Sequence, residues 1–377
     1  MGLGVVLGFL GLVLVLGGGG FVGFAFGSGG FEECSKLMMV WWLKIDFSGG
    51  VGQLGLISWV DDGGSVSWNF EEIDWKKFSA IATYTAAITV IGWSTTTGFP
   101  VTESVDRKRR NMMILRLEGK VALITGAASG IGEEAVRLFA ENGALVVAAD
   151  VQDELGHQVV ASIISTTNGN NVCYHHCDVR DEKQVEETVN FTLKKHGKLD
   201  ILFSNAGIIG PLTSILELDI TGLDNTMATN VRGVAATIKH AARAMVAKNV
   251  RGSIICTTSV ASSLGGTGPH AYTASKHALV GLVRSACSEL GAHGIRVNCV
   301  SPFGVATPLS CTAYNLQPNE VEANSCAVSN LKGIVLKARH IAEAALFLAS
   351  DESAYISGHN LAVDGGFTVV NNSFSAT

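Results

Sequence analysis

A chain of 377 residues that is 47% hydrophobic and 16% charged has enough apolar residues to form a buried core, which excludes a mostly disordered protein. The formal net charge is −6, from 27 basic and 33 acidic residues. This balance provides no positive field to neutralise phosphates, so it argues against binding nucleic acid by bulk electrostatics.

The first third of the chain differs in composition from the rest. All six tryptophans lie between Trp41 and Trp93, and 20 of the 44 glycines lie before residue 111. Residues 36–100 show no sustained period of 3.6 or 2, so we assign no fold to residues 1–116. Our hypothesis is that the functional polypeptide begins near Met112 or Met113, and that the preceding residues are a poorly ordered extension or a gene-model error.

An apolar tract opens this extension. No charge precedes Glu32, and the tract nearly supplies the roughly 20 apolar residues that a membrane helix needs. Glycines at 17–20 interrupt it, no basic segment precedes it, and Val6 occupies the position where myristoylation requires Ser or Thr. We therefore expect membrane contact only if the extension is real, and a cytoplasmic location for the enzyme.

The eight cysteines lack the C-x-x-C spacing of metal or redox motifs, which is typical of reduced thiols in an intracellular protein. Cys173 and Cys177 enclose two histidines, a set that could bind a metal ion. Because this stretch resembles a strand, its side chains alternate between two faces and do not converge. We expect strand packing here and no metal site.

From Leu117 onward, short apolar runs alternate with helical patterns. The expected strands are 120–125, 144–149, 172–176, 199–204, 252–258 and 294–300. The expected helices are 131–142, 181–196, 223–248 and 270–290. This alternation predicts one α/β domain over residues 117–377, a doubly wound parallel sheet of the Rossmann type. Ligands of such folds bind at the carboxyl ends of the strands.

A glycine-rich turn follows the first of these strands, with the sequence Thr-Gly-Ala-Ala-Ser-Gly-Ile-Gly at 125–132. Glycines there let backbone N–H groups approach a pyrophosphate at the start of the next helix. The cofactor contacts expected in this turn are Gly126, Ser129, Gly130, Ile131 and Gly132.

Asp150 ends the second strand and is expected to bind the hydroxyls of the adenosine ribose. Its carboxylate would repel the 2′-phosphate of NADP, and no Arg or Lys lies in the glycine turn or directly after Asp150. The sequence therefore favours NAD as the cofactor.

Ser259 follows the fifth strand, and thirteen residues later comes Tyr272, with Lys276 on the same helical face. A neighbouring cation favours a phenolate and lowers the tyrosine pKa from about 10, which would make Tyr272 a usable acid or base. Taken alone, the pair is better explained by an ordinary helix start with a solvated lysine.

Together these motifs resemble the short-chain dehydrogenase/reductase family over residues 117–370. The matching positions also include Asp178 and Val179 after the third strand, Ser204-Asn205-Ala206-Gly207 after the fourth, Asn230, and Val-Asp-Gly-Gly at 363–366. Within the family, residues 204–208 and 299–308 are similar to the plant group of secoisolariciresinol dehydrogenase-like enzymes of secondary metabolism.

The resemblance implies roles for these residues. Tyr272 would be the general base for alcohol oxidation, and Lys276 would hold the nicotinamide ribose and lower the Tyr272 pKa. Ser259 would bind the substrate oxygen, and Asn230 would hold a water that links Lys276 to solvent. The other implied cofactor contacts are Asp178 and Val179 at the adenine, Asn205, Ala206 and Gly207 at the ribose, and Val305 and Thr307 at the carboxamide.

Two positions depart from the family pattern. Ser204 stands where the family has Asn, which leaves the amide of Asn205 in place. Phe303 separates Pro302 from Gly304, and we expect its ring near the nicotinamide, where it would shape the substrate pocket. Other apolar residues expected around the substrate are Ile208, Ile209, Leu264 and Leu309. The segment between Thr307 and Lys337 is either a mobile lid or a flexible surface connection.

The predicted activity is NAD-dependent oxidation of a hydrophobic secondary alcohol or lactol, of terpenoid or lignan type, to the ketone or lactone. Two alternatives remain open: an NADPH-dependent ketone reductase, and a non-redox protein that keeps the NAD fold as a cyclase, isomerase or binding scaffold. The helices at 223–248 and 270–290 carry apolar residues beyond one stripe. With the family resemblance, this predicts a homotetramer or homodimer.

Overall fold

The computed structural model divides the chain into two compact units, Met1–Asn111 and Met112–Thr377. In the first unit the structure describes the backbone of six strands, and in the second it describes residues 115–167 and 171–370. The proposed start at Met112 or Met113 lies outside the described residues.

The first unit contains an antiparallel sheet in which each strand pairs with the next along the chain. The sequence pattern predicted no fold for this part. Its strands are β1 (Gly4–Leu7), β2 (Leu12–Gly17), β3 (Phe21–Phe26), β4 (Met39–Ile45), β5 (Gly52–Ser58) and β6 (Asn69–Glu72). Across the described part of the chain, no helix is both long and apolar enough to span a bilayer.

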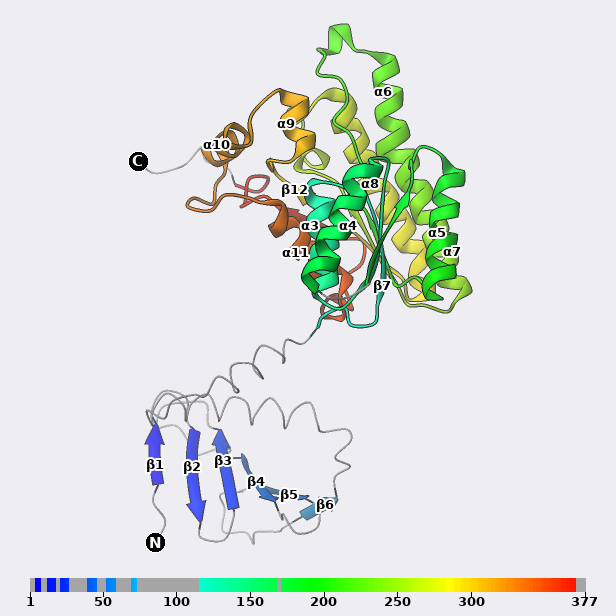
Figure 1. Ribbon diagram of the computed structural model, residues 1–377. Coiled ribbons are helices and arrows are strands. Elements are labelled where there is room, and N and C mark those ends of the chain that lie inside the picture. The colour runs from blue at the N-terminus through cyan, green and yellow to red at the C-terminus, as the bar shows by residue number, and fades with distance from the viewer. Residues whose placement is uncertain are drawn as a thin grey trace, which may run out of the picture. The chain divides into compact units, whose positions relative to one another are not determined.

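The second unit is built on a seven-stranded parallel sheet with the order β13-β12-β11-β10-β7-β8-β9 (Figure 1). The strands are β7 (Val121–Thr125), β8 (Leu145–Asp150), β9 (Val172–His176), β10 (Ile201–Ser204), β11 (Ser253–Thr257), β12 (Arg296–Pro302) and β13 (Asn360–Val363). From β7 the chain adds β8 and β9 on one side of the sheet and then β10 and the later strands on the other side. This switch between β7 and β10 creates a crevice at their carboxyl ends. The predicted doubly wound parallel sheet is therefore confirmed.

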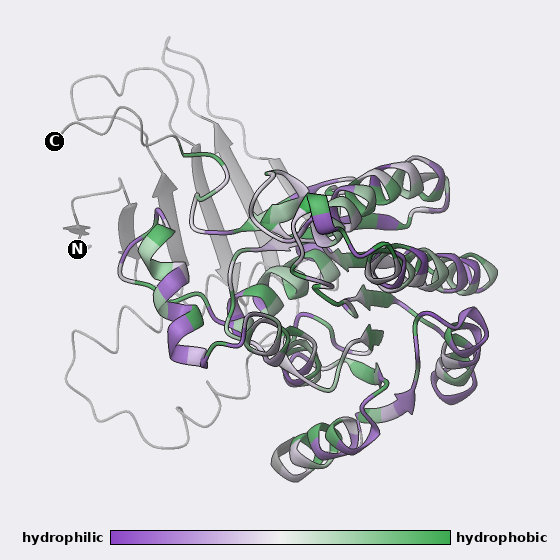
Figure 2. Cartoon of the chain, turned by 90° about the horizontal axis from the view of Figure 1, so that it is seen from above, coloured by the Kyte–Doolittle hydropathy of each residue, from purple (hydrophilic) through white to green (hydrophobic). Residues whose placement is uncertain are grey.

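Helices cover both faces of this sheet, so its strands are buried on both sides. Alternate residues of β7 face opposite cores: Ala122 and Ile124 pack in one and Leu123 in the other. The first core includes α3 (Gly130–Glu141), α4 (Asp153–Thr167) and α11 (Ala338–Ala349), and the second includes α5 (Glu182–His196), α7 (Val234–Ala247) and α8 (His270–Leu290). Figure 2 shows hydrophobic residues beside hydrophilic ones along these helices, as expected for helices that pack by one face.

The helix predicted at 223–248 is interrupted. It consists of α6 (Ile220–Met227), a π-helical turn (Ala228–Gly233) and α7, whereas α8 has the predicted bounds. Asn230 lies in the π turn. Short 3₁₀ helices occur at Ile215–Glu217, Val260–Ser262, Gly291–His293 and Asp351–Ser353.

The segment between Thr307 and Lys337 contains two helices, α9 (Pro308–Tyr314) and α10 (Pro318–Val328). Thr307 caps α9: its hydroxyl accepts a hydrogen bond from the Ser310 backbone N–H, and the Ser310 hydroxyl accepts one from the Thr307 N–H. The lid or connection expected from the sequence therefore has a defined helical structure.

The outer faces of α7 and α8 differ from the prediction of a second apolar stripe. Within the described residues, no large apolar side chain of these two helices is exposed. The large apolar side chains of α8, such as Leu279 and Val283, are buried in the core of the unit, and its exposed residues include Ala274 and Gly281. A partner packed there would meet small side chains together with polar ones such as His277 and Arg284.

Candidate active site

A pocket of about 950 Å³ lies at the carboxyl ends of the central strands. It brings together nearly all of the predicted site residues, although they come from many separate segments. Those that line it are Gly126, Ser129, Gly130, Ile131, Asp150, Asp178, Val179, Asn205, Ala206, Gly207, Ser259, Tyr272, Lys276, Val305 and Thr307. Gly132 and Asn230 do not line the pocket, and each supports a residue that does.

The glycine turn is packed too closely for side chains. Gly126 has a φ of +65°, and a Cβ there would lie 2.8 Å from the Ala206 Cα. A Cβ on Gly132 would lie 1.9 Å from the Gly126 carbonyl oxygen, so glycine at this position lets α3 start directly against the turn. The first backbone N–H groups of α3 follow Ser129 and face the pocket, where an anion would be stabilised.

Asp150 is 6% exposed at the end of β8, and its carboxylate is held in place from two sides. Oδ2 accepts a hydrogen bond from the Ala128 backbone N–H at 3.0 Å, and Oδ1 accepts one from the Gln152 N–H at 3.0 Å. A carboxylate fixed in this way can accept hydrogen bonds from a diol at the pocket wall.

Arg180 is a pocket residue that the sequence reasoning missed, although it comes directly after the Asp178-Val179 motif. Its guanidinium binds the Asp178 carboxylate at 2.7 to 3.0 Å and donates to Asn225 Oδ1 at 3.2 Å. Hydrogen bonding to Arg180 lowers the pKa of Asp178. The cation of this wall is therefore already paired within the protein.

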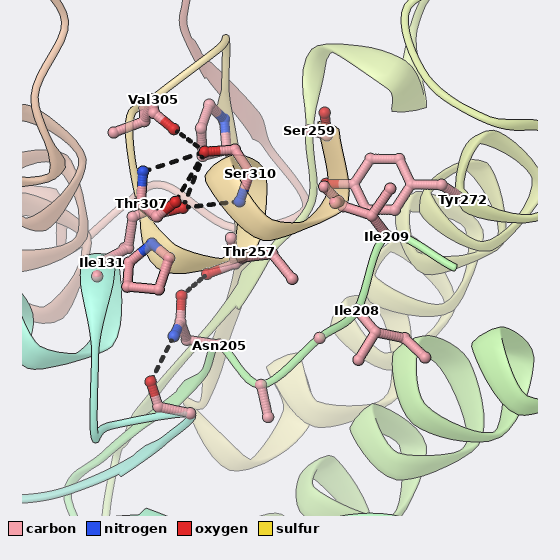
Figure 3. Close-up of a pocket in the computed structure, with 18 of the residues that line it drawn as sticks. Ile131, Asn205, Ile208, Ile209, Thr257, Ser259, Tyr272, Val305, Thr307 and Ser310 are labelled. Carbon is pink, nitrogen blue, oxygen red and sulfur yellow. Dashed lines mark hydrogen bonds between the residues drawn. The ribbon is translucent and has the colours of Figure 1, made fainter. Parts of the chain in front are cut away.

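Asn205 links three strand ends. Its Nδ2 donates to the carbonyl oxygens of Thr125 and Gly126, each at 3.2 Å, and its Oδ1 accepts from the Thr257 hydroxyl at 2.9 Å (Figure 3). The family pattern places an amide here, and the structure shows that this amide fixes the crevice between β7, β10 and β11. Ser204, the departure from that pattern, is buried and bonds the Thr237 hydroxyl at 2.8 Å.

Tyr272 and Ser259 lie close together in the pocket (Figure 3). Burial raises the pKa of Tyr272 to about 12, a hydrogen bond with Ser259 lowers it, and the neighbouring Tyr314 raises it. The Lys276 Nζ lies 5.3 Å from the centre of the Tyr272 ring and donates to the Thr257 carbonyl oxygen at 2.8 Å. The lowered Tyr272 pKa expected from the sequence is therefore wrong for this structure, because burial outweighs the hydrogen bond with Ser259.

Asn230 is fully buried behind these residues. Its side chain accepts from the Ile208 backbone N–H at 2.9 Å and donates to the Ile208 carbonyl oxygen at 2.8 Å and to the Ser275 hydroxyl at 3.0 Å. It thus ties the segment after β10 to α8, the helix of Tyr272 and Lys276. The water implied for Asn230 by the resemblance stays a prediction.

Apolar side chains form much of the rest of the pocket lining. Ile208, Ile209, Phe303 and Leu309 line the pocket as predicted, whereas Leu264 does not. Leu264 comes after the 3₁₀ turn of Ser262 and is directed elsewhere by that turn, since its N–H bonds the Val260 carbonyl oxygen. The Phe303 ring stacks on Phe367, with 4.3 Å between ring centres.

Further lining residues come from α9, from α10 and from Leu316 between the two helices, and sequence reasoning did not identify most of them. They are Pro308, Ser310, Thr312, Ala313, Tyr314, Leu316, Val321, Asn324, Ser325 and Val328. A Cβ on Gly304 would lie 2.3 Å from the Ser325 Oγ, so the glycine lets α10 pack directly on the segment after β12. Gly304 therefore fixes one wall of the pocket.

The two histidine side chains of β9 have separate partners. The His175 ring packs on Phe191, with 4.6 Å between ring centres, while His176 Nδ1 lies 2.8 Å from Asp153 Oδ1. Among the residues that the structure describes, no group of three or more His, Cys, Asp or Glu side chains could hold a metal ion.

Replacing Lys276 with Met is expected to stabilise the fold. Burial lowers the pKa of Lys276 from 10.5 to about 8, so the unfolded chain binds more protons than the folded chain between these values. The buried charge therefore lowers the free energy of unfolding by at most about 3 kcal/mol, and this full effect is present below about pH 8. The effect becomes smaller as the pH rises toward 10.5, the pKa of the lysine in the unfolded chain.

Thermal unfolding followed by circular dichroism tests this. K276M should raise the unfolding midpoint by several degrees near neutral pH and by less in mildly alkaline buffer. Lys239→Met, which removes an exposed lysine paired with Glu182, is the control and should not raise it. A lower midpoint for K276M near neutral pH would contradict the prediction.

Known proteins resemble the second unit in sequence and structure. A family model described as Enoyl-(Acyl carrier protein) reductase matches residues 126–368. Short-chain dehydrogenase reductase 3b of Arabidopsis thaliana is 64% identical over 255 residues, which cover 68% of this chain and 98% of that protein. Momilactone A synthase of Oryza sativa subsp. japonica is 51% identical over 261 residues, which cover 69% and 93%. The crystal structure of levodione reductase matches with a TM-score of 0.64 and 32% identity, over 68% of this chain and 100% of that one.

Proposed function

Because this chain belongs to the short-chain dehydrogenase/reductase family of oxidoreductases, we propose that it oxidises a hydrophobic secondary alcohol or lactol to the ketone or lactone, with NAD as the hydride acceptor. The observation that carries the proposal is a single pocket that contains Ser259, Tyr272 and Lys276 together with the glycine turn and Asp150. The same pocket thus offers an acid–base group and a dinucleotide site.

The residues present fit NAD. The glycine turn and the start of α3, which line the pocket through Gly126, Ser129 and Gly130, would hold the pyrophosphate, and Asp150 would hold the adenosine ribose. Asp178 and Val179 would flank the adenine, and Val305 and Thr307 would hold the carboxamide. When bound, the oxidised nicotinamide supplies the hydride acceptor for the reaction.

Tyr272 would remove the proton of the substrate hydroxyl, while the hydrogen on the same carbon leaves as hydride. A pKa of about 12 makes the phenolate rare at neutral pH, so catalysis requires groups that stabilise it. Lys276, whose pKa is about 8, is mostly charged at neutral pH, and its Nζ lies 5.3 Å from the centre of the Tyr272 ring, where its charge would stabilise the phenolate. Ser259 would donate a hydrogen bond to the substrate oxygen.

The walls around Tyr272 support a hydrophobic substrate. Ile208, Ile209, Leu309 and Val321 supply apolar surface, which favours a terpenoid or lignan alcohol over a small polar one. The name of the rice relative, momilactone A synthase, also supports a small molecule as the substrate.

The carboxylate of Asp150 speaks against the alternative of an NADPH-dependent reductase, since it would repel a 2′-phosphate. Arg180, which lines the same pocket, is engaged by Asp178. Intact Ser259, Tyr272 and Lys276 in one pocket speak against a non-redox cyclase, isomerase or scaffold.

A cytoplasmic homotetramer or homodimer completes the proposal. The seven cysteines of the described residues are all free, which supports a reducing compartment. The family resemblance and the small side chains on the outer face of α8, among them Ala274 and Gly281, support association through that helix.

The test is NADH formation by the full chain across a panel of hydrophobic secondary alcohols and lactols, with NAD and NADP supplied in parallel. We expect turnover with at least one cyclic alcohol or lactol and a preference for NAD. Oxidation only with NADP would replace the cofactor assignment. Conversion of a panel compound without any change in NADH would support a non-redox function instead.

A further inference from the structure

A network of polar side chains, most of them buried, lies directly behind Ser259. It joins Thr258 at the end of β11, Ser262 in the 3₁₀ turn, Ser301 in β12 and Asn360 at the start of β13. Thr258 and Ser301 are each 1% exposed and Ser262 is 7% exposed. Such a network is strongest when all of its members are satisfied.

The amide of Asn360 is the centre of the network. Its Nδ2 donates to the Ser262 Oγ at 3.1 Å, and its Oδ1 lies 2.7 Å from the Ser301 Oγ and 3.1 Å from the Thr258 Oγ1. The Ser301 Oγ also lies 2.6 Å from the Thr258 Oγ1 and 3.1 Å from the Ser259 carbonyl oxygen. One side chain from β13 therefore contacts residues on both sides of Ser259.

The network contacts the turn that carries Ser259, through the Ser259 carbonyl oxygen and the Ser262 hydroxyl. The Ser259 hydroxyl accepts a hydrogen bond from the Ala261 N–H at 3.2 Å, so its direction depends on the turn of residues 259–262. Three of the supporting residues, Ser262, Ser301 and Asn360, do not line the pocket. Their effect on a substrate or cofactor can only be indirect.

We propose that Asn360 and Ser301 are positioning residues, which clamp the turn of residues 258–262 so that the Ser259 hydroxyl stays directed at the hydroxyl of Tyr272. The inference rests on the proposed function as far as turnover is concerned. It assigns part of the catalytic geometry to residues of β12 and β13 that do not themselves line the pocket.

Two small deletions separate this role from general stability. Ser301→Ala removes a partner of the Asn360 oxygen, and Ser262→Ala removes the acceptor of its N–H. Both leave side chains that fit the same space. A displacement of a catalytic group by about 1 Å can cost roughly 100-fold in rate, so we expect kcat to fall by about 10-fold or more in each variant. The KM for NAD should stay within about twofold, because Asp150 and the glycine turn are unchanged.

Ser253→Ala is the matched control. Ser253 is the first residue of β11, at the end of the strand away from the turn of Ser259. It is 3% exposed, and its hydroxyl donates a hydrogen bond to the Leu348 carbonyl oxygen at 2.8 Å. The S253A variant, like S301A, loses one buried hydroxyl, but it leaves the contacts of the Ser259 turn unchanged. We expect S253A to lower the thermal unfolding midpoint as much as S301A does, and to keep kcat within about twofold of the wild type.

The ionisation and the environment of the Tyr272 hydroxyl can both be measured. A loss of stability alone would change neither measurement. The hydrogen bond from Ser259 lowers the Tyr272 pKa, so displacing Ser259 should shift the pH profile of kcat/KM for alcohol oxidation to higher pH. Lys276 and Tyr314, the titratable groups that face Tyr272, are the same in all variants. In protein labelled with ¹³C at tyrosine Cζ, the Tyr272 resonance, assigned with Y272F, should move in S301A and S262A toward its position in Ser259→Ala.

The outcomes decide the question whether or not a substrate is found. Low kcat with an alkaline pH shift and a moved Tyr272 resonance in S301A and S262A, but not in S253A, supports the proposal. A Tyr272 resonance that is the same in S301A, S253A and the wild type overturns it, as does a kcat equal to that of S253A. If the wild type oxidises no alcohol, the proposed function fails, and the resonance still tests the clamp on Ser259.

Discussion

Replacing Tyr272 with Phe is expected to lower the rate of alcohol oxidation by about 10² to 10⁴-fold, because the variant lacks the group that takes the substrate proton. The ring is buried and Phe fills the same space, so the fold and the walls of the pocket should be kept. NAD affinity should stay close to that of the wild type, since Asp150, Asn205 and the glycine turn lie apart from the phenol hydroxyl. The measurements are kcat/KM from NADH formation and the Kd of NAD from titration calorimetry.

Tyr314→Phe is the control for this experiment. Tyr314 also lines the pocket and also loses only a phenol hydroxyl, but it lies on α9 and is 42% exposed. Its removal should change KM for the alcohol more than kcat. Turnover by Y272F within about twofold of the wild type would show that another group acts as the base.

The sheet was predictable from the sequence because both of its faces are covered. Strands such as Val121–Thr125 are buried along their whole length and therefore stand out as apolar runs. β13 is four residues long and only partly buried at the sheet edge, so its pattern is weak. In α4 only Val159 and Ile163 are buried apolar residues, which is too sparse for a periodic signal. The π turn of residues 228–233 leaves the helical pattern around it continuous, so no break was visible.

The site was predictable as far as it follows from strand ends. Parallel strands end at the same edge of the sheet, which brings Gly126, Asp150, Asn205 and Ser259 together from a motif order alone. Contacts between residues far apart in the sequence, such as the stacking of Phe303 on Phe367, leave no motif from which they could be predicted. The direction of the Tyr272 pKa shift was also beyond the sequence, because it depends on how deeply the phenol is buried.

The hydroxyl network behind Ser259 shows the same limit. Thr258 and Asn360 are 102 positions apart along the chain, and neither belongs to a motif of the family pattern. Serine and asparagine in strands are ordinarily solvated or satisfied locally, so their meeting point is visible only once β11, β12 and β13 are in register. Residues that position a catalytic group from behind are therefore the part of a site that motif reasoning misses most readily.

Replacing Asp150 with Ala should weaken NAD binding by roughly 10 to 100-fold, the loss expected for hydrogen bonds to a charged group. NADP binding should improve relative to NAD, because the carboxylate no longer repels a 2′-phosphate. Asp153→Asn is the control. This aspartate lies three residues after Asp150, but its carboxylate pairs with His176 and Tyr174 and does not line the pocket. Calorimetric titration of both variants with NAD and NADP checks the expectation, and thermal unfolding shows whether D150A keeps its fold after the Ala128 N–H loses its acceptor. A folded D150A that binds NAD as tightly as the wild type, with the same ratio to NADP, would show that Asp150 does not hold the ribose.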